Sequence, residues 1–135
     1  GKAAHAGNSH KEGANALWAL AKLVDRVQGL TDYARGITVN VGKVTGGSSK
    51  NTVPDRAEAL IDLRFETRAD GEALVEAVRR AAEECATSVQ GTRIEIEGGV
   101  KGVDVNVGVP WPPVKLIRLI SWPLVRKYSY FVRGL

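Results

Sequence analysis

The stretch Ala57-Glu58-Ala59-Leu60-Ile61-Asp62-Leu63-Arg64-Phe65 decides the fold of this 135-residue chain. Apolar residues recur at every second position, which is the pattern of a β-strand with one buried face. That face would carry Ala57, Ala59, Ile61, Leu63 and Phe65. The opposite face would carry Glu58, Asp62 and Arg64 together with Leu60. We therefore expect a sheet that a second layer covers on one side.

Two more strands and two helices surround this stretch. Residues 37–41 and 92–97 alternate in the same way and predict strands. Residues 11–28 and 70–88 instead repeat apolar side chains at three- and four-residue steps, which predicts amphipathic helices. The element order is helix, strand, strand, helix, strand.

A strand in front of the first helix would complete the βαββαβ order of a ferredoxin-like fold. The predicted fold class is therefore α+β, an antiparallel sheet with both helices on one face. Only Gly1–Ala4 is left for that first strand, so we expect the chain to be truncated at its start. The truncation would leave a slot inside the sheet. We expect the alternating residues 103–109 to fill it, antiparallel to 92–97 and parallel to 57–65.

The charge divides the chain near residue 100. Residues 1–100 hold 13 Lys and Arg against 14 Asp and Glu, whereas residues 101–135 hold six against one. We interpret 1–100 as one domain and 101–135 as a basic tail. Residues 1–100 lack the excess of positive charge that nucleic-acid binding needs, and no nucleic-acid partner is expected. The one cysteine, Cys85, excludes an internal disulfide and a cysteine-based zinc site and leaves the compartment open.

His5 is the first candidate binding residue. It stands among small residues in Gly1-Lys2-Ala3-Ala4-His5-Ala6-Gly7, where tight backbone would let a substrate approach closely. From the spacing alone, a loop histidine ahead of a helix is the simpler interpretation. His5 and His10 lack the helical spacing and the acidic third ligand of a zinc site, so no metal or other cofactor is expected in this chain.

Two further candidates lie near the decisive stretch. Asn51, in the loop that runs from Gly46-Gly47 to Pro54, offers both an amide donor and an acceptor. A plain hairpin connection fits that loop almost as well. Arg64 points away from the helices in the predicted sheet and could hold a carboxylate through two nitrogens. A surface ion pair with Glu58 or Asp62 is the competing interpretation.

Three of these motifs, taken together, resemble one family. Gly1–Gly7 followed by Gly13-Ala14-Asn15-Ala16-Leu17 is similar to the segment that enters the dimerisation (lid) domain of certain zinc metallopeptidases. These are the aminoacylases, glutamate carboxypeptidases and succinyl-diaminopimelate desuccinylases. Gly46-Gly47 through Asn51-Thr52-Val53-Pro54-Asp55 resembles their glycine-rich Asn-x-(Ile/Val)-Pro loop, and Asp62-Leu63-Arg64 resembles their Asp-x-Arg strand. The resemblance covers residues 1–100.

The resemblance implies a zinc-dependent, two-domain hydrolase that cleaves amide bonds next to a free carboxylate. The zinc ligands and catalytic carboxylates would lie in a catalytic domain outside this chain, which alone should not be active. This chain would supply dimerisation, through the 37–44 strand and the 11–28 helix, and substrate binding.

The resemblance also implies roles for single residues. His5 would reach across the dimer to the oxyanion in the partner's active site. Asn51, Gly46 and Gly47 would contact the substrate, a peptide or N-acyl amino acid. Arg64 would hold the substrate carboxylate.

The tail departs from the family, and the function has an alternative. Residues 109–135 contain four prolines, five basic residues and no acid. They are interpreted as an out-of-frame or artificial continuation, as a basic segment on a membrane surface, or as an ordered packing arm. A non-enzymatic ferredoxin-like interaction or ligand-sensing module would share the element order. An RNA-binding sheet is disfavoured because 37–41 carries no aromatic residue.

Overall fold

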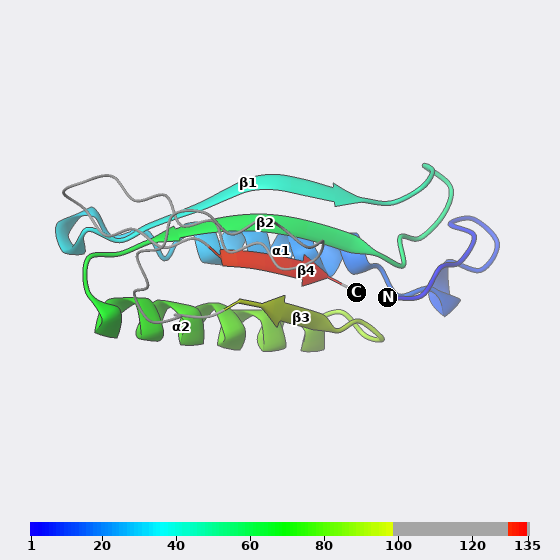
Figure 1. The fold of residues 1–135 in the computed structure, drawn as a ribbon. Helices are drawn as coiled ribbons and strands as arrows, with labels where there is room; N and C mark the ends of the chain where they lie inside the picture. Colours follow the sequence, from blue (N-terminus) through cyan, green and yellow to red (C-terminus); the bar gives the residue numbers. More distant parts are fainter. Residues whose placement is uncertain (99–129, 135) are drawn as a thin grey trace.

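The computed structural model describes residues 1–98 and 130–134, which form a four-stranded antiparallel sheet and two helices (Figure 1). The helices pack on one face of the sheet, so the predicted α+β class is confirmed. The helices are α1 (Ala16–Gln28) and α2 (Arg68–Thr87). The strands are β1 (Thr38–Gly46), β2 (Ala57–Arg64), β3 (Ile94–Glu97) and β4 (Tyr130–Gly134).

Strand β2 behaves as its alternation predicts. Its side chains are alternately buried and half-buried, and Phe65, which follows it, is 1% exposed. The buried face meets the apolar stripes of both helices and forms one core. Burial of this apolar surface is the main driving force for the fold. The largest fully buried side chains are Phe65, Leu20, Leu23, Leu63 and Val27.

Helix α1 begins later than the sequence predicted. Its first residue is Ala16, because the side-chain oxygen of Asn15 accepts a hydrogen bond from the backbone N–H of Trp18 at 2.8 Å and caps the helix. Residues His10–Glu12 form a separate 3₁₀ turn, and Gly13 after it is extended. Among the described residues, neither helix is long and apolar enough to cross a membrane.

Helix α2 is longer at its start than predicted, because Thr67 caps it. The Thr67 hydroxyl accepts from the backbone N–H of Asp70 at 3.1 Å and donates to the Asp70 carboxylate at 2.7 Å. The hydrogen bond from Thr67 lowers the pKa of the Asp70 carboxyl, and the Arg35 guanidinium acts in the same direction. This contact therefore stabilises the fold above the ordinary pKa of 3.8 and weakens as the pH falls below it.

The slot inside the sheet is filled, but not by the predicted residues. The strand order is β1-β2-β4-β3, and β4 pairs antiparallel with both β2 and β3. Residues 103–109 lie outside the described residues, and the place expected for them belongs to Tyr130–Gly134. The expected parallel pairing with β2 is also wrong. β2 and β3 run in the same direction, so a strand between them that is antiparallel to one is antiparallel to both.

Residues 1–4 do not contribute to the main sheet. Lys2 exchanges two backbone hydrogen bonds of 2.9 Å with Ala14, and the carbonyl of Ala4 accepts from the N–H of Val53 at 2.8 Å. The segment is therefore fixed to the start of α1 and to the loop before β2. This attachment positions His5.

Gly71→Ala tests the packing of α2 on the core. Alanine normally stabilises a helix interior by about 1 kcal/mol relative to glycine. Here a Cβ at Gly71 would overlap the ring of Phe65, so we expect a net loss of about 1–3 kcal/mol in the free energy of unfolding. Urea denaturation measures it, with the exposed Glu72→Ala as control. A Gly71→Ala variant as stable as the wild type would show that the ring is not held there.

Candidate functional site

The structure brings His5 and Asn51 together at one end of the sheet. The segment around His5 runs antiparallel to the loop before β2, with His5 opposite Thr52. The N–H of Ala6 donates to the carbonyl of Asn51 at 2.8 Å. Two of the predicted site residues, 46 positions apart in the sequence, thus lie on two backbone segments that are hydrogen-bonded to each other.

The imidazole of His5 is held in one tautomer. Its Nδ1 accepts hydrogen bonds from the backbone N–H groups of Gly7 and Asn8, both at 3.1 Å. A nitrogen that accepts carries no proton in a neutral imidazole, so the proton lies on Nε2. Among residues 1–98 no group bonds to Nε2, and the side chain is exposed. His5 is therefore a fixed, outward hydrogen-bond donor.

The glycine at position 7 allows this arrangement. A Cβ there would lie 3.3 Å from Cε1 and 3.4 Å from Nδ1 of the His5 ring. The backbone of the turn is also closed by Ser9, whose N–H donates to the His5 carbonyl at 3.1 Å and whose hydroxyl accepts from the His5 N–H at 3.2 Å. The His5 side chain is thus set by its own turn, before any partner binds.

The side chain of Asn51 is oriented by its neighbours in the loop. Its Oδ1 accepts from the hydroxyl of Ser49 at 2.7 Å, and that hydroxyl lies 2.9 Å from the hydroxyl of Thr52. The acceptor oxygen is engaged, so the Asn51 amide NH₂ is the group that can face a ligand. His5 and Asn51 both present hydrogen-bond donors at this end of the molecule.

Gly46 and Gly47 allow a backbone conformation that a larger residue would disturb. Gly46 ends β1 opposite Ala57, and a Cβ there would lie 2.8 Å from the Cβ of Ala57. Gly47 follows with φ +78, in the left-handed region that favours glycine. Both positions shape the loop that carries Asn51.

Arg64 lies at the other end of β2. Seven residues separate it from Ala57, which is roughly 23 Å along a strand. Its Nε donates to the carboxylate of Asp62 at 2.5 Å, one of the two surface ion pairs that the sequence suggested. The side chain is 43% exposed, so the outer nitrogens of the guanidinium can still reach a ligand. Within one chain, Arg64 does not join His5 and Asn51.

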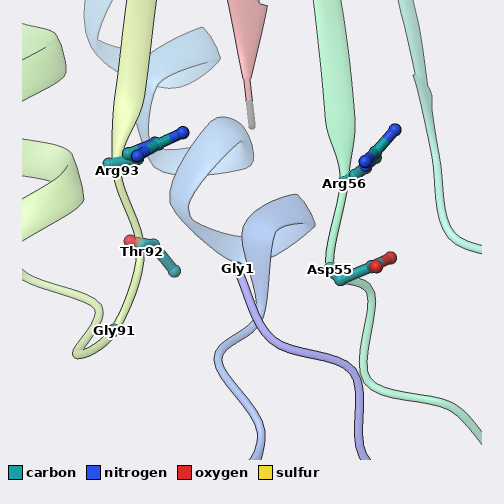
Figure 2. Close-up of a pocket in the computed structure, with 6 residues that line it drawn as sticks. All are labelled: Gly1, Asp55, Arg56, Gly91, Thr92 and Arg93. Atoms are coloured by element: carbon teal, nitrogen blue, oxygen red, sulfur yellow. The ribbon is translucent and has the colours of Figure 1, made fainter.

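A polar pocket that the sequence did not predict lies beside Gly1 (Figure 2). It has a volume of about 510 Å³ and is bordered by Asp55 and Arg56 before β2 and by Thr92 and Arg93 before β3. No local sequence signal could have found this pocket, because residues that precede two strands far apart in the sequence line it.

No metal site is built from the part of the chain that the structure describes. Within residues 1–98 and 130–134, no three His, Cys, Asp or Glu side chains converge on one point. The residues present therefore do not fit a catalytic zinc, which needs three protein ligands.

The outer edge of the sheet carries an exposed apolar side chain. β1 is an edge strand, and most of its second half is exposed. Val44 on β1 is 44% exposed. The N–H groups of Val39 and Val41 donate to side-chain oxygens of Thr31 (3.1 Å) and Gln28 (2.7 Å). These two side chains cover part of an edge that could otherwise pair with another strand.

Comparison with known proteins confirms the resemblance. Residues 1–89 match the family model of the peptidase dimerisation domain. A homolog of p-aminobenzoyl-glutamate hydrolase from Haemophilus influenzae is 36% identical over 122 residues, which are 90% of this chain and 28% of that protein. This chain thus spans little more than a quarter of that relative. Because the match includes 122 of the 135 residues, it must continue past residue 100.

Two solved structures share the fold. The aminobenzoyl-glutamate utilization protein from Klebsiella pneumoniae superposes with a TM-score of 0.60 at 30% identity, over 64% of this chain and 22% of that one. A tripeptidase from Staphylococcus aureus gives a TM-score of 0.58 at 30% identity, over 65% of this chain and 23% of that one.

Proposed function

This chain belongs to the peptidase dimerisation domain family, and from that premise we propose that it pairs two hydrolase subunits and completes the partner's substrate site. The observation that carries the proposal is the His5 tautomer. Two backbone N–H groups engage Nδ1, so Nε2–H points outward as a donor. A donor whose direction is fixed in advance is what stabilises a developing oxyanion, because it needs no reorganisation during the reaction.

We propose that the substrates are peptides or N-acyl amino acids, cleaved at an amide bond next to a free carboxylate. The name of the Haemophilus relative, a p-aminobenzoyl-glutamate hydrolase homolog, supports this class. Arg64 fits the carboxylate end, because a guanidinium can bind a carboxylate with two parallel hydrogen bonds. Its bond to Asp62 uses Nε and leaves the two outer nitrogens for that purpose.

The remaining groups would bind the substrate around the scissile amide. Asn51 would donate from its amide NH₂, since Ser49 already engages its oxygen. Gly46 and Gly47 would contribute by shaping the loop. The metal that activates water in such hydrolases, which we propose to be zinc, would be bound by the catalytic domain and not by this chain.

The distance between Arg64 and His5 supports action across a dimer. His5 lies near the start of β2 and Arg64 lies at its end, and these two places are roughly 20 Å or more apart. A dipeptide-sized substrate spans only about 7–10 Å. If both residues contact substrate, those of one chain therefore serve two different molecules of substrate. A dimer in which each protomer lends His5 to the other satisfies this requirement.

We propose that the dimer forms along β1 and α1. Edge strands of two copies can join their sheets about a two-fold axis. Val44 gives this edge an exposed apolar side chain. A partner strand would take over the N–H groups of Val39 and Val41 from Thr31 and Gln28.

Val44→Asp tests this edge. We expect it to raise the dimer dissociation constant by on the order of a hundredfold, because the two-fold axis introduces two buried like charges at once. Sedimentation equilibrium measures the constant. Val44→Thr, which keeps the branched shape and the neutral charge, serves as control. Equal dimer stability in Val44→Asp and wild type would exclude this edge from the interface.

A further inference from the structure

Strand β4 lies inside the sheet, between β2 and β3, although the long connection that leads to it does not force it into this place. Residues 98–129 separate it from β3, its neighbour, whereas antiparallel neighbours can be joined by a two-residue turn. Its other neighbour, β2, is more distant still in the sequence. The position of β4 is therefore determined by the strands on either side of it.

We propose that the space between β2 and β3 is a binding groove for one extended strand, and that its occupant, Tyr130–Gly134, can be replaced by the same sequence supplied as a separate peptide. The partner class is an extended peptide that is recognised through its main chain and its register. This is strand addition to a sheet, with the difference that the added strand pairs on both of its sides.

The backbone pairing gives the groove its affinity. Tyr130–Gly134 is in register with Ala57–Ile61 on one side and, for Phe131–Gly134, with Ile94–Glu97 on the other. An empty groove would leave the facing N–H and C=O groups of both β2 and β3 without partners, and unpaired backbone groups are costly when they are shielded from water. A strand between β2 and β3 provides hydrogen-bond partners for the facing backbone groups of both strands.

The test uses the full chain with Val132→Pro and a synthetic peptide of residues 128–135. Proline removes a backbone N–H that a central strand needs, whereas the control Val132→Ile keeps it and stays apolar. We expect Val132→Pro to lower the Tm by roughly 10 °C and Val132→Ile to change it by less than half as much. The labelled peptide should bind the proline variant and raise its Tm. It should bind the wild type at least about tenfold more weakly, because the groove is filled.

A second measurement, on the wild-type chain, covers the case in which Val132→Pro does not fold. Among the described residues β3 pairs only with β4, so the backbone amides of Ile94–Glu97 should be protected from hydrogen exchange only if β4 fills the groove. A proline variant as stable as the wild type would overturn the proposal, since β4 would not fill the groove. A destabilised variant that neither binds the peptide nor is restored by it would also overturn it. Fast exchange of the Ile94–Glu97 amides in the wild type would overturn it as well.

Discussion

Replacing His5 by alanine is expected to lower the turnover of the enzyme that this domain completes by on the order of a hundredfold. The reason is the fixed Nε2–H donor, which Gly7 and Asn8 hold in place through Nδ1. A donor that acts mainly on the oxyanion lowers the transition state more than the bound substrate. The loss should therefore appear in kcat, with little change in KM. Steady-state kinetics of the whole enzyme, domain and catalytic part together, measures both.

His10 is the matched control for this experiment. It lies in the same segment and is exposed, but its place in the His10–Glu12 turn gives it no contact with the Asn51 loop in the described part of the chain. His10→Ala should leave kcat within about twofold of the wild type. A similar loss in both variants, or an effect of His5→Ala on KM alone, would contradict the role of His5 at the oxyanion.

Arg64→Ala is expected to weaken the binding of carboxylate-bearing substrates by about 2–4 kcal/mol, if the ion pair with the substrate is shielded from water. The effect should fall on KM or Kd and spare kcat at saturation. Arg64→Lys should recover only part of the binding, because an ammonium group cannot form the paired hydrogen bonds of a guanidinium. Inhibition or kinetics with a carboxylate ligand measures the loss.

Two controls isolate the contact between Arg64 and the substrate. Asp62→Asn breaks the existing ion pair with Arg64 and should change binding much less than Arg64→Ala. A substrate whose carboxylate is converted to an amide should bind wild type and Arg64→Ala equally well. If Arg64→Ala weakened the amide substrate just as strongly, the arginine would be acting on the structure of β2 and not on the carboxylate.

Local periodicity predicted the elements of residues 1–98 well. Strand β2 and its buried face follow directly from the alternation at 57–65, because each side of a strand faces one environment. The start of α1 was missed by five residues. The apolar repeat of the helix starts at Leu17 and does not fix where the helix begins. Gly13 is extended and Asn15 caps the helix, so the cap sets its first residue.

The central strand could not be predicted in the same way. Residues 103–109 alternate more regularly than Tyr130–Gly134, yet the latter pair with β2 and β3. Which segment occupies a central position depends on backbone pairing and register against two distant strands, and neither is visible in local alternation. The three interpretations of the tail stay predictions.

The candidate site was only partly visible in the sequence. The motifs drew attention to His5 and Asn51, but their pairing across the Thr52 bridge is a tertiary contact. The tautomer of His5 depends on how its turn folds back on Nδ1, which no spacing rule gives. Arg64 was predicted both as a ligand for carboxylate and as a partner of Asp62. The structure contains the ion pair, and the carboxylate role stays a prediction.

Complementation between two inactive protomers tests the central claim most directly. One protomer carries His5→Ala, and the other carries a catalytic domain inactivated by mutation of its general base. If each protomer lends His5 to its partner, mixing the two should restore about a quarter of wild-type activity, because half of the dimers are mixed and each has one complete site. If activity stays at the level of the separate variants although mixed dimers form, His5 does not act across the dimer, and the proposed function is wrong.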